Sequence, residues 1–414
     1  MNQKVVITGL GTINCLGSSL SDSWCEILAG KSGIVAYQSE NGQSLRSRVY
    51  GPIQSFNAAD YLDPAVVKKT DPFVQYALIS AKEAIAQSAL MDADINKDDV
   101  GVIMTSGIGG LAGLESNINI AYQKSAKRIS PFYIPSTIIN VVSGHVSMAY
   151  GFRGPSYSPV SACASGTHAI GLAMRAIQCG DAQVVIAGGS EAAGTYTGMG
   201  GFSALRALST RNDDPQGASR PFDRDRDGFV LSDGAGAVVL ESLEHAQKRG
   251  ANILAECVGF GMSSDAFHIT QPDETGAGAQ LAIERALNNA HAKPNQIDYI
   301  NAHGTSTPYN DRIEATVIKR VYQDHVKDLA VSSTKSMVGH SLGAAGAIEA
   351  VFTIQAMQDS MCPPTINLAN PDEAAQGLNL VPNQAQPKTI YRAMSHSFGF
   401  GGTNAVLMFQ SFCD

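Results

Sequence analysis

Two segments of the sequence carry a residue that could act as a nucleophile. Cys163 lies in SACASG ahead of an apolar helical run, and Ser341 lies in GHSLG, which fits the G-x-S-x-G turn of hydrolases and acyltransferases. A cysteine at a helix N-terminus lies near unpaired N–H groups and the positive end of the helix dipole, which favour the thiolate. Those N–H groups could also hold an oxyanion formed by attack on a thioester. A small buried hydrophobic role fits Cys163 as well, so position alone does not decide.

The spacing around Ser341 disfavours a serine nucleophile. A nucleophile elbow places its serine at a sharp turn between a strand and a helix. Here the expected strand LAVSS ends near Ser333, several residues before Gly339, and the later histidine is His396 with no acidic residue in the expected order. We therefore expect Ser341 to begin a helix.

Two histidines and a lysine in the second half of the chain could act on a bound substrate. His303 follows the expected strand IDYINA, and a histidine at the carboxyl end of a strand is placed to face a cleft. A hydrogen-bonded core histidine fits the same position. Lys335 and His340 share the segment SSTKSMVGHSLG, and Glu349 follows in the next expected helix.

Asp311 and Glu314 lie three residues apart in NDRIEA. This is the spacing of a helix N-cap and its reciprocal glutamate. We expect a structural role for this pair rather than acid or base catalysis.

The composition excludes several classes of protein. The chain has 414 residues, of which 44% are hydrophobic and 16% charged, and its net charge is −8. This is globular composition, and the negative charge argues against general binding of nucleic acid. The start MNQKVVITGLG has too short an apolar run for a signal peptide, and no stretch approaches the roughly 20 apolar residues of a membrane span.

The cysteines and two glycine-containing motifs argue against cofactors. The seven cysteines are scattered without a C-x-x-C pair, which predicts no disulfide framework, no metal site and a reducing cytoplasm. GIGGLA (107–112) matches the weak form of a dinucleotide fingerprint but has no clear βαβ unit with the ribose-binding acid. DRDRDG (223–228) mimics an EF-hand loop, but Gly234 stands where the required glutamate would be.

Apolar runs alternate with amphipathic or alanine-rich segments along the whole chain. The runs KVVITGLG, DVGVIMTSG, AQVVIAGGSEA, GAGAVVLES, ILAECVGFG and AVLMFQS predict buried strands, and FVQYALISAKEAIAQSAL and AQLAIERALNNAH predict helices. This alternation predicts an α/β fold. The plan of VSACASGTHAIGLAMRAIQ is repeated loosely in VSSTKSMVGHSLGAAGAIEAVFTIQAM. We therefore expect two similar halves, 1–250 and 251–414.

The combined motifs resemble a known enzyme family. Cys163 in SACASG, His303 in NAHGTSTP, STKSMVGHSLGAAG and SFGFGGTN occur in the order found in the β-ketoacyl-(acyl-carrier-protein) synthases. SGIGGL, ISPFYIPSTIIN, GGFSALRALSTRNDDPQGASRPFDRDRDGFVLSDGAG and VGFGMSSDAFHIT resemble the synthase II type. The resemblance covers residues 3–410. It implies the thiolase-like fold, with two α/β halves in five αβαβα layers, a cytoplasmic homodimer, and acyl carrier protein as partner.

The resemblance also implies a reaction and the residues that perform it. Cys163 would accept an acyl chain from acyl carrier protein, and decarboxylated malonyl-carrier protein would then attack that thioester, so no separate cofactor is expected. Neutral His303 and His340 would stabilise the carbanion through two N–H donors. The backbone N–H groups of Cys163 and Phe400 would form a second oxyanion hole. Lys335, near His340 and held by Glu349, would tune the site electrostatically.

Further positions are carried over from the family. Phe398 and Phe400 match a gate for acyl chains, and Thr305 and Thr307 match contacts with pantetheine, with Thr270 beside the entrance. The acyl pocket would be lined by Ile108, Phe202 and Tyr133 of the partner subunit. A basic patch for the acidic carrier protein would consist of Lys68, Lys69, Lys127, Arg128 and Arg206.

Three features depart from the expected family pattern. His396 stands where the family commonly has Asn, and Ala164 follows the nucleophile where the synthase II type often has Thr. The segment GHSLG resembles the corresponding motif of the type I synthases. Rival hypotheses are a serine acyltransferase that uses Ser341, a non-enzymatic chain-length partner subunit, and a polyketide or specialised-lipid synthase. The presence of Cys163 disfavours the partner subunit, because such relatives lack the nucleophile.

Overall fold

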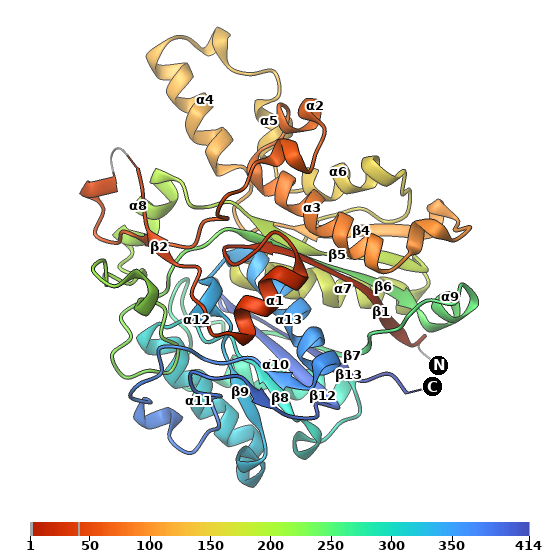
Figure 1. Ribbon diagram of the computed structural model, residues 1–414, viewed down its shortest axis with the longest axis vertical. Coiled ribbons are helices and arrows are strands. Elements are labelled where there is room, and N and C mark those ends of the chain that lie inside the picture. The colour runs from red at the N-terminus through yellow and green to blue at the C-terminus, as the bar shows by residue number, and fades with distance from the viewer. Residues whose placement is uncertain (1–2, 40–41, 414) are drawn as a thin grey trace.

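The computed structural model describes residues 3–39 and 42–413, which fold into an α/β structure (Figure 1). Within these residues a nine-stranded sheet runs in the order β4-β5-β6-β1-β7-β13-β12-β8-β9. Its strands are β1 (Val5–Asn14), β4 (Val100–Thr105), β5 (Val184–Glu191), β6 (Gly234–Ser242), β7 (Ala255–Ser264), β8 (Tyr299–Asn301), β9 (Ala330–Ser332), β12 (Arg392–Gly399) and β13 (Thr403–Gln410). Two small ladders pair β2 (Val35–Ala36) with β3 (Val49–Tyr50), and β10 (Met361–Cys362) with β11 (Gln386–Pro387).

The sheet divides into two parts at the contact between β1 and β7. In the described chain this antiparallel pairing is limited to Val6 with Glu256 and Ile7 with Ala255. The part before it contains one parallel pair, β4 with β5, and the part after it contains two, β8 with β9 and with β12. Each part is therefore a mixed sheet that belongs to one half of the chain.

Helices cover both outer faces and fill the space between the two parts of the sheet (Figure 1). The outer face of the first part carries α3 (Pro72–Gln87) and α6 (Val141–Tyr150), and that of the second carries α10 (Ala277–Asn289) and α11 (Pro308–Tyr322). Between them lie α7 (Ser165–Cys179) and α13 (Ala345–Asp359), whose apolar side chains form one core with both parts. The predicted five-layered, thiolase-like α/β arrangement is confirmed.

Close packing of the two central helices depends on small residues. A Cβ atom added to Gly166 on α7 would lie 2.8 Å from the backbone nitrogen of Ala347 on α13. The alanine-rich sequence of α13 has the same consequence, because short side chains let the helix approach both the sheet and its neighbour.

The predicted regular elements match the structure closely. All six apolar runs named above are strands, and the two predicted helices are α3 and α10. The remaining helices are α1 (Leu20–Leu28), α2 (Pro64–Val67), α4 (Leu111–Gln123), α5 (Tyr133–Thr137), α8 (Tyr196–Ala204), α9 (Leu243–Lys248) and α12 (Lys335–Val338). Among the described residues, no helix has the length and apolar character needed to cross a membrane.

Candidate active site

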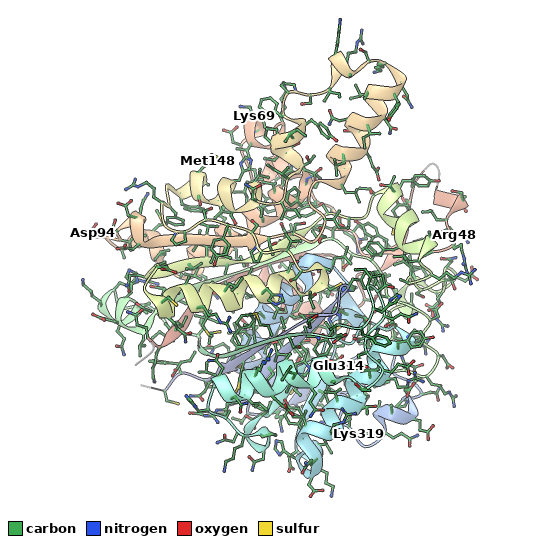
Figure 2. All side chains as sticks on the ribbon, turned by 180° about the vertical axis from the view of Figure 1, so that it is seen from behind. Arg48, Lys69, Asp94, Met148, Glu314 and Lys319 are labelled. Atoms are coloured by element: carbon green, nitrogen blue, oxygen red, sulfur yellow. The ribbon has the colours of Figure 1, made fainter. Side chains whose placement is uncertain are left out.

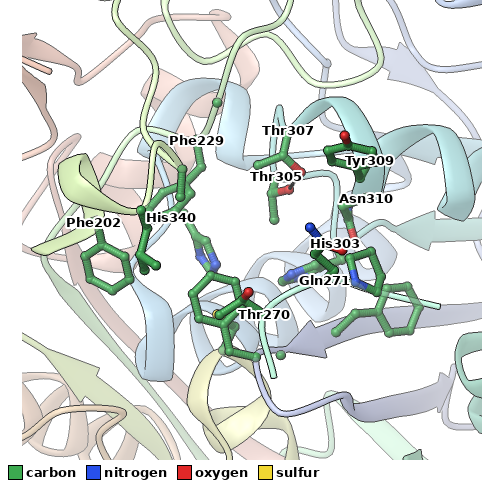
Figure 3. A pocket seen from close by; sticks show the side chains of 18 of the residues that line it. Phe202, Phe229, Thr270, Gln271, His303, Thr305, Thr307, Tyr309, Asn310 and His340 are labelled. Carbon is green, nitrogen blue, oxygen red and sulfur yellow. Dashed lines mark hydrogen bonds between the residues drawn. The ribbon is translucent and has the colours of Figure 1, made fainter. Parts of the chain in front are cut away.

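Five of the residues expected to do chemistry come from both halves of the chain and line one cavity, whereas Lys335 is not among its lining residues (Figure 3). Its volume is about 310 Å³. Cys163 precedes α7, His303 follows β8 and His340 follows α12. Phe398 is the second-last residue of strand β12, and Phe400 follows that strand.

Cys163 lies in a tight turn that has an equivalent in the second half. The 3₁₀ turn Ala162–Ala164 leads into α7, and Ala162 has a φ of 50°. The 3₁₀ turn Leu342–Ala344 leads into α13, and Leu342 has a φ of 45°. Gly343 therefore occupies the place equivalent to Cys163, and a Cβ atom there would lie 2.1 Å from the backbone nitrogen of Gly107. The second half repeats the turn without room for a side chain.

The environment of Cys163 opposes formation of a thiolate. Burial raises the pKa of the Cys163 thiol to about 11. The charge of Lys335 and the backbone N–H groups of Phe400 and Cys163 act in the opposite direction but do not outweigh burial. Because desolvation dominates, the free enzyme holds a thiol at neutral pH.

His303 and His340 form an edge-to-face pair in the cavity. Their ring centroids lie 5.4 Å apart with an interplanar angle of 86°. Burial, and then the charge of Lys335, lower the pKa of both histidines well below the ordinary value. Both rings are therefore neutral at physiological pH, as the family resemblance implied, and each retains one N–H donor.

Lys335 forms hydrogen bonds with His303, and its charge also acts on His340. Its Nζ atom donates to the carbonyl oxygen of His303 at 2.6 Å and lies 3.4 Å from the Nδ1 atom of that residue. Its ammonium group also forms a buried ion pair with Glu349, as expected. Burial raises the pKa of Glu349 to about 7 against the lowering effect of Lys335. The lysine thus fixes the His303 backbone and keeps positive charge near both imidazoles.

Asp311 and Glu314 have structural roles, but neither is a helix cap. The N-cap of α11 is Thr307, so Asp311 lies inside the first turn. Asp311 accepts hydrogen bonds from the backbone N–H groups of Phe222 (2.8 Å) and Ser306 (3.1 Å), and burial raises its pKa to about 6. Glu314 accepts from the backbone N–H groups of His303 (2.9 Å) and Gly304 (2.7 Å). Both carboxylates hold the segment that follows β8.

Ser341 does not occupy a nucleophile elbow. The preceding strand β9 ends at Ser332, and α12 intervenes before Gly339. Ser341 is buried and is the N-cap of the 3₁₀ turn that leads into α13. It therefore begins a helical segment, as predicted.

Family models match most of the chain. The N-terminal domain of the β-ketoacyl synthases matches residues 2–246, and their C-terminal domain matches residues 254–369. The chain belongs to the β-ketoacyl synthase family. The 3-oxoacyl-(acyl-carrier-protein) synthase 2 of Coxiella burnetii is 50% identical over 412 residues, which cover 100% of this chain and 99% of the relative.

Solved structures of ketosynthases have the same fold as this synthase. A β-ketoacyl synthase from Burkholderia phymatum STM815 superposes with a TM-score of 0.93 and 33% identity, covering 99% of this chain and 100% of that one. A type II polyketide ketosynthase solved with its acyl-carrier protein and a bound hexaketide gives a TM-score of 0.91 and 33% identity, with full coverage of both chains.

Most of the other residues carried over from the family also line the cavity of this synthase. Phe202, Thr270, Thr305 and Thr307 do so, and the hydroxyl groups of Thr305 and Thr307 lie 2.9 Å apart (Figure 3). Ile108 is not among the lining residues; it packs on the same apolar cluster as Cys163 and Phe202. Tyr133 begins α5, outside this cavity, which leaves its expected place in a partner's pocket a prediction.

The five basic residues fall in two places on the synthase. Arg206 is exposed and lines the cavity. The other four are exposed at the ends of α2 and of the 3₁₀ turn Ala126–Arg128, in the part of the chain that projects with α4 and α5 (Figure 1). Figure 2 shows Lys69 on this projection, well separated from Glu314.

Two important residues were not identified from the sequence. Phe229 packs edge-to-face against both Phe202 (5.5 Å between centroids) and His340 (5.3 Å). Glu191, at the end of β5, accepts from the backbone N–H groups of Gly107 (2.8 Å) and Gly343 (2.9 Å) and so joins the two halves behind the cavity. Glu191 could have been identified from the sequence, because it lies at the end of a predicted buried strand, as His303 does.

Proposed function

We propose that the protein catalyses the decarboxylative condensation that elongates fatty acids, joining an acyl chain on Cys163 to malonyl-acyl carrier protein. The observation that carries the proposal is one cavity that holds a cysteine, two backbone N–H groups directed at its sulfur, and two neutral histidines. The products are 3-oxoacyl-acyl carrier protein, two carbons longer than the acyl substrate, and carbon dioxide.

Acyl transfer to Cys163 is the first step. Its Sγ atom attacks the thioester carbon of acyl carrier protein, the bond from that carbon to the pantetheine sulfur breaks, and the thiol proton passes to the departing sulfur. The N–H groups of Phe400 and Cys163 stabilise the oxyanion that forms during the attack. Because the cysteine is a buried thiol at rest, proton loss accompanies attack rather than precedes it.

Decarboxylation and condensation follow at the histidines. The bond between the malonyl carboxylate and its α-carbon breaks, carbon dioxide leaves, and the electron pair forms an enolate. Neutral His303 and His340 donate hydrogen bonds to the enolate oxygen without supplying a strong acid that would quench it. The enolate carbon attacks the acyl carbon on Cys163, the carbon–sulfur bond breaks, and the sulfur regains a proton from solvent.

Acyl carrier protein is the proposed partner, and no further cofactor is required. The substrates arrive as thioesters, which supply both the electrophile and the activated carboxylate. Arg206 at the cavity is available to meet an acidic carrier. The fatty-acid pathway is favoured over a polyketide pathway because the synthase 2 relative is 50% identical, whereas the hexaketide-bound ketosynthase is 33% identical.

We further propose a homodimer in a reducing cytoplasm. Exposed apolar side chains gather on α5, α6 and the segment that runs beside β4; they are Ile134, Ile138, Met148, Tyr157 and Val160. Burial of this surface against a second copy would bring Tyr133 towards a partner's pocket. Sedimentation of the protein as a monomer at micromolar concentration would contradict this part of the proposal.

The test uses acyl carrier proteins loaded with acyl chains of graded length. Mass spectrometry is expected to find the acyl adduct on Cys163 and the extended 3-oxoacyl product after malonyl-carrier protein is added. Cys163→Ala should abolish both, whereas Ser341→Ala and the matched control Cys257→Ala should retain them. An adduct on Ser341, or elongation by Cys163→Ala, would overturn the proposal, and the range of chain lengths accepted gives the depth of the pocket.

A further inference from the structure

His396 is a fully buried histidine that does not line the cavity and has no role in the steps above. It lies in β12, where its neighbour in β13 is Val406. Its ring centroid lies 5.7 Å from that of Phe398, and the Phe398 ring lies 5.7 Å from that of His303. His396 is thus one aromatic side chain removed from a histidine of the cavity.

A carboxylate links His396 to the backbone of His303. The Nδ1 atom of His396 lies 3.2 Å from Oε1 of Glu314, the same oxygen that accepts the backbone N–H of His303 at 2.9 Å. The other oxygen of Glu314 accepts the N–H of Gly304 at 2.7 Å. A carboxylate only accepts hydrogen bonds, so Nδ1 of His396 is the donor. The imidazole therefore completes the set of donors that orients Glu314.

The second ring nitrogen of His396 lacks a hydrogen bond in the described part of the chain. Its Nε2 atom is buried and has no hydrogen-bond partner among the described residues. A buried polar atom without a partner is costly, and it is retained where the group has another use. That cost distinguishes His396 from an ordinary hydrogen-bonded core histidine.

The charged groups around His396 come from several elements. Helix α11 contributes Glu314, and Asp311 one turn earlier is paired with Arg226. A buried ion pair joins Lys335 on α12 to Glu349 on α13. Beyond these ion pairs, Glu314 is the carboxylate that His396 contacts directly.

Burial is the main cause that lowers the pKa of His303, and the charge of Lys335 is the next. The neutral ring of His303 therefore depends mainly on its depth and on Lys335.

We propose that His396 is a positioning residue for His303, acting through Glu314 on its backbone. The assignment rests on the proposed condensation, because it concerns the histidine that stabilises the enolate. Acylation of Cys163 does not use that enolate site. Decarboxylation of malonyl-carrier protein should therefore depend on His396, whereas acylation should not.

The test separates the two half-reactions in three variants. His396→Leu removes the donor to Glu314, and His396→Asn keeps an N–H donor for it. His245→Asn is the matched control, because His245 forms a similar pair with Glu241 away from the cavity. Acylation is measured as the mass of the Cys163 adduct from acyl-carrier protein, and decarboxylation as carbon dioxide released from malonyl-carrier protein.

We expect His396→Leu to release carbon dioxide about tenfold to a hundredfold more slowly while acylation changes less than about twofold. His396→Asn should stay within about threefold of the wild type in carbon dioxide release, because it keeps an N–H donor for Glu314. His245→Asn should match the wild type in both respects.

A wild-type rate of carbon dioxide release in His396→Leu would overturn the assignment. An equal fall of acylation and decarboxylation would also overturn it, because that pattern indicates a purely structural role. If the wild type itself released no carbon dioxide, the proposed function would fail first, and the assignment with it.

Discussion

Cys163 and Gly343 occupy equivalent places in the two halves, each one residue after a residue with positive φ and just ahead of a central helix. One place carries a nucleophile beside the cavity. The other has no room for a side chain, because the backbone of Gly107 fills it. The same local turn thus carries the nucleophile in the first half of the chain and allows close packing in the second half.

Gly343→Ala should destabilise the protein by about 3 kcal/mol, because a Cβ atom there meets backbone that cannot move aside. Gly201→Ala on α8 is the matched control: its Cβ meets nothing within 4 Å, so its stability should change by no more than about 1 kcal/mol. Urea unfolding of both variants measures the difference. Equal stability of the two would show that the turn has more freedom than its contacts imply.

The pH dependence of Cys163 alkylation follows from its thiol. Since burial raises its pKa to about 11, the thiolate fraction should rise about tenfold per pH unit from pH 7 to pH 10. Iodoacetamide labelling followed by peptide mass spectrometry measures the rate. Cys257, buried with a pKa raised to about 12, should remain unlabelled over the same range. A labelling rate at Cys163 that levels off below pH 8 would mean that the thiolate is already formed.

Much of this site could be predicted from the sequence, since it depends on local order along the chain. The helix after Cys163 and the strand before His303 are visible in the pattern of apolar residues. The hydrogen-bond partners of His303 could not be predicted from the sequence. Glu314 accepts from its backbone N–H, and Lys335, which follows β9 in the chain, donates to its carbonyl oxygen. The helix terminus beside Cys163 was visible in the sequence, but the depth of burial that raises the pKa of its thiol was not.

Asp233 should make stability depend on pH in a defined direction. Burial raises its pKa to about 7, so the folded state binds this proton more tightly than the unfolded chain, and stability is lost as pH rises from about 4 to about 7. Asp233→Asn removes that loss while keeping an acceptor for the Gly194 N–H. The variant should therefore gain up to about 4 kcal/mol relative to the wild type over this range. Denaturant unfolding at several pH values measures the gain, and a constant difference between the two proteins would contradict it.

Arg206→Glu should weaken use of carrier-bound substrates. Reversal of an exposed charge at the cavity opposes an acidic carrier, so kcat/KM should fall about tenfold at low salt, and less as salt is added. Acyl thioesters of free pantetheine should show a much smaller fall. Arg46→Glu, at another exposed position, is the control. A fall of the same size with free pantetheine would place Arg206 in the chemistry rather than in docking.

The most direct test of the account compares acylation and condensation in one experiment. His303→Ala and His340→Ala are each incubated with acyl-carrier protein and malonyl-carrier protein, and the Cys163 adduct and the 3-oxoacyl product are quantified together by mass spectrometry. The account predicts that both variants form the adduct while the product falls at least about a hundredfold. Normal product formation without the histidines, or loss of the adduct together with the product, would contradict it.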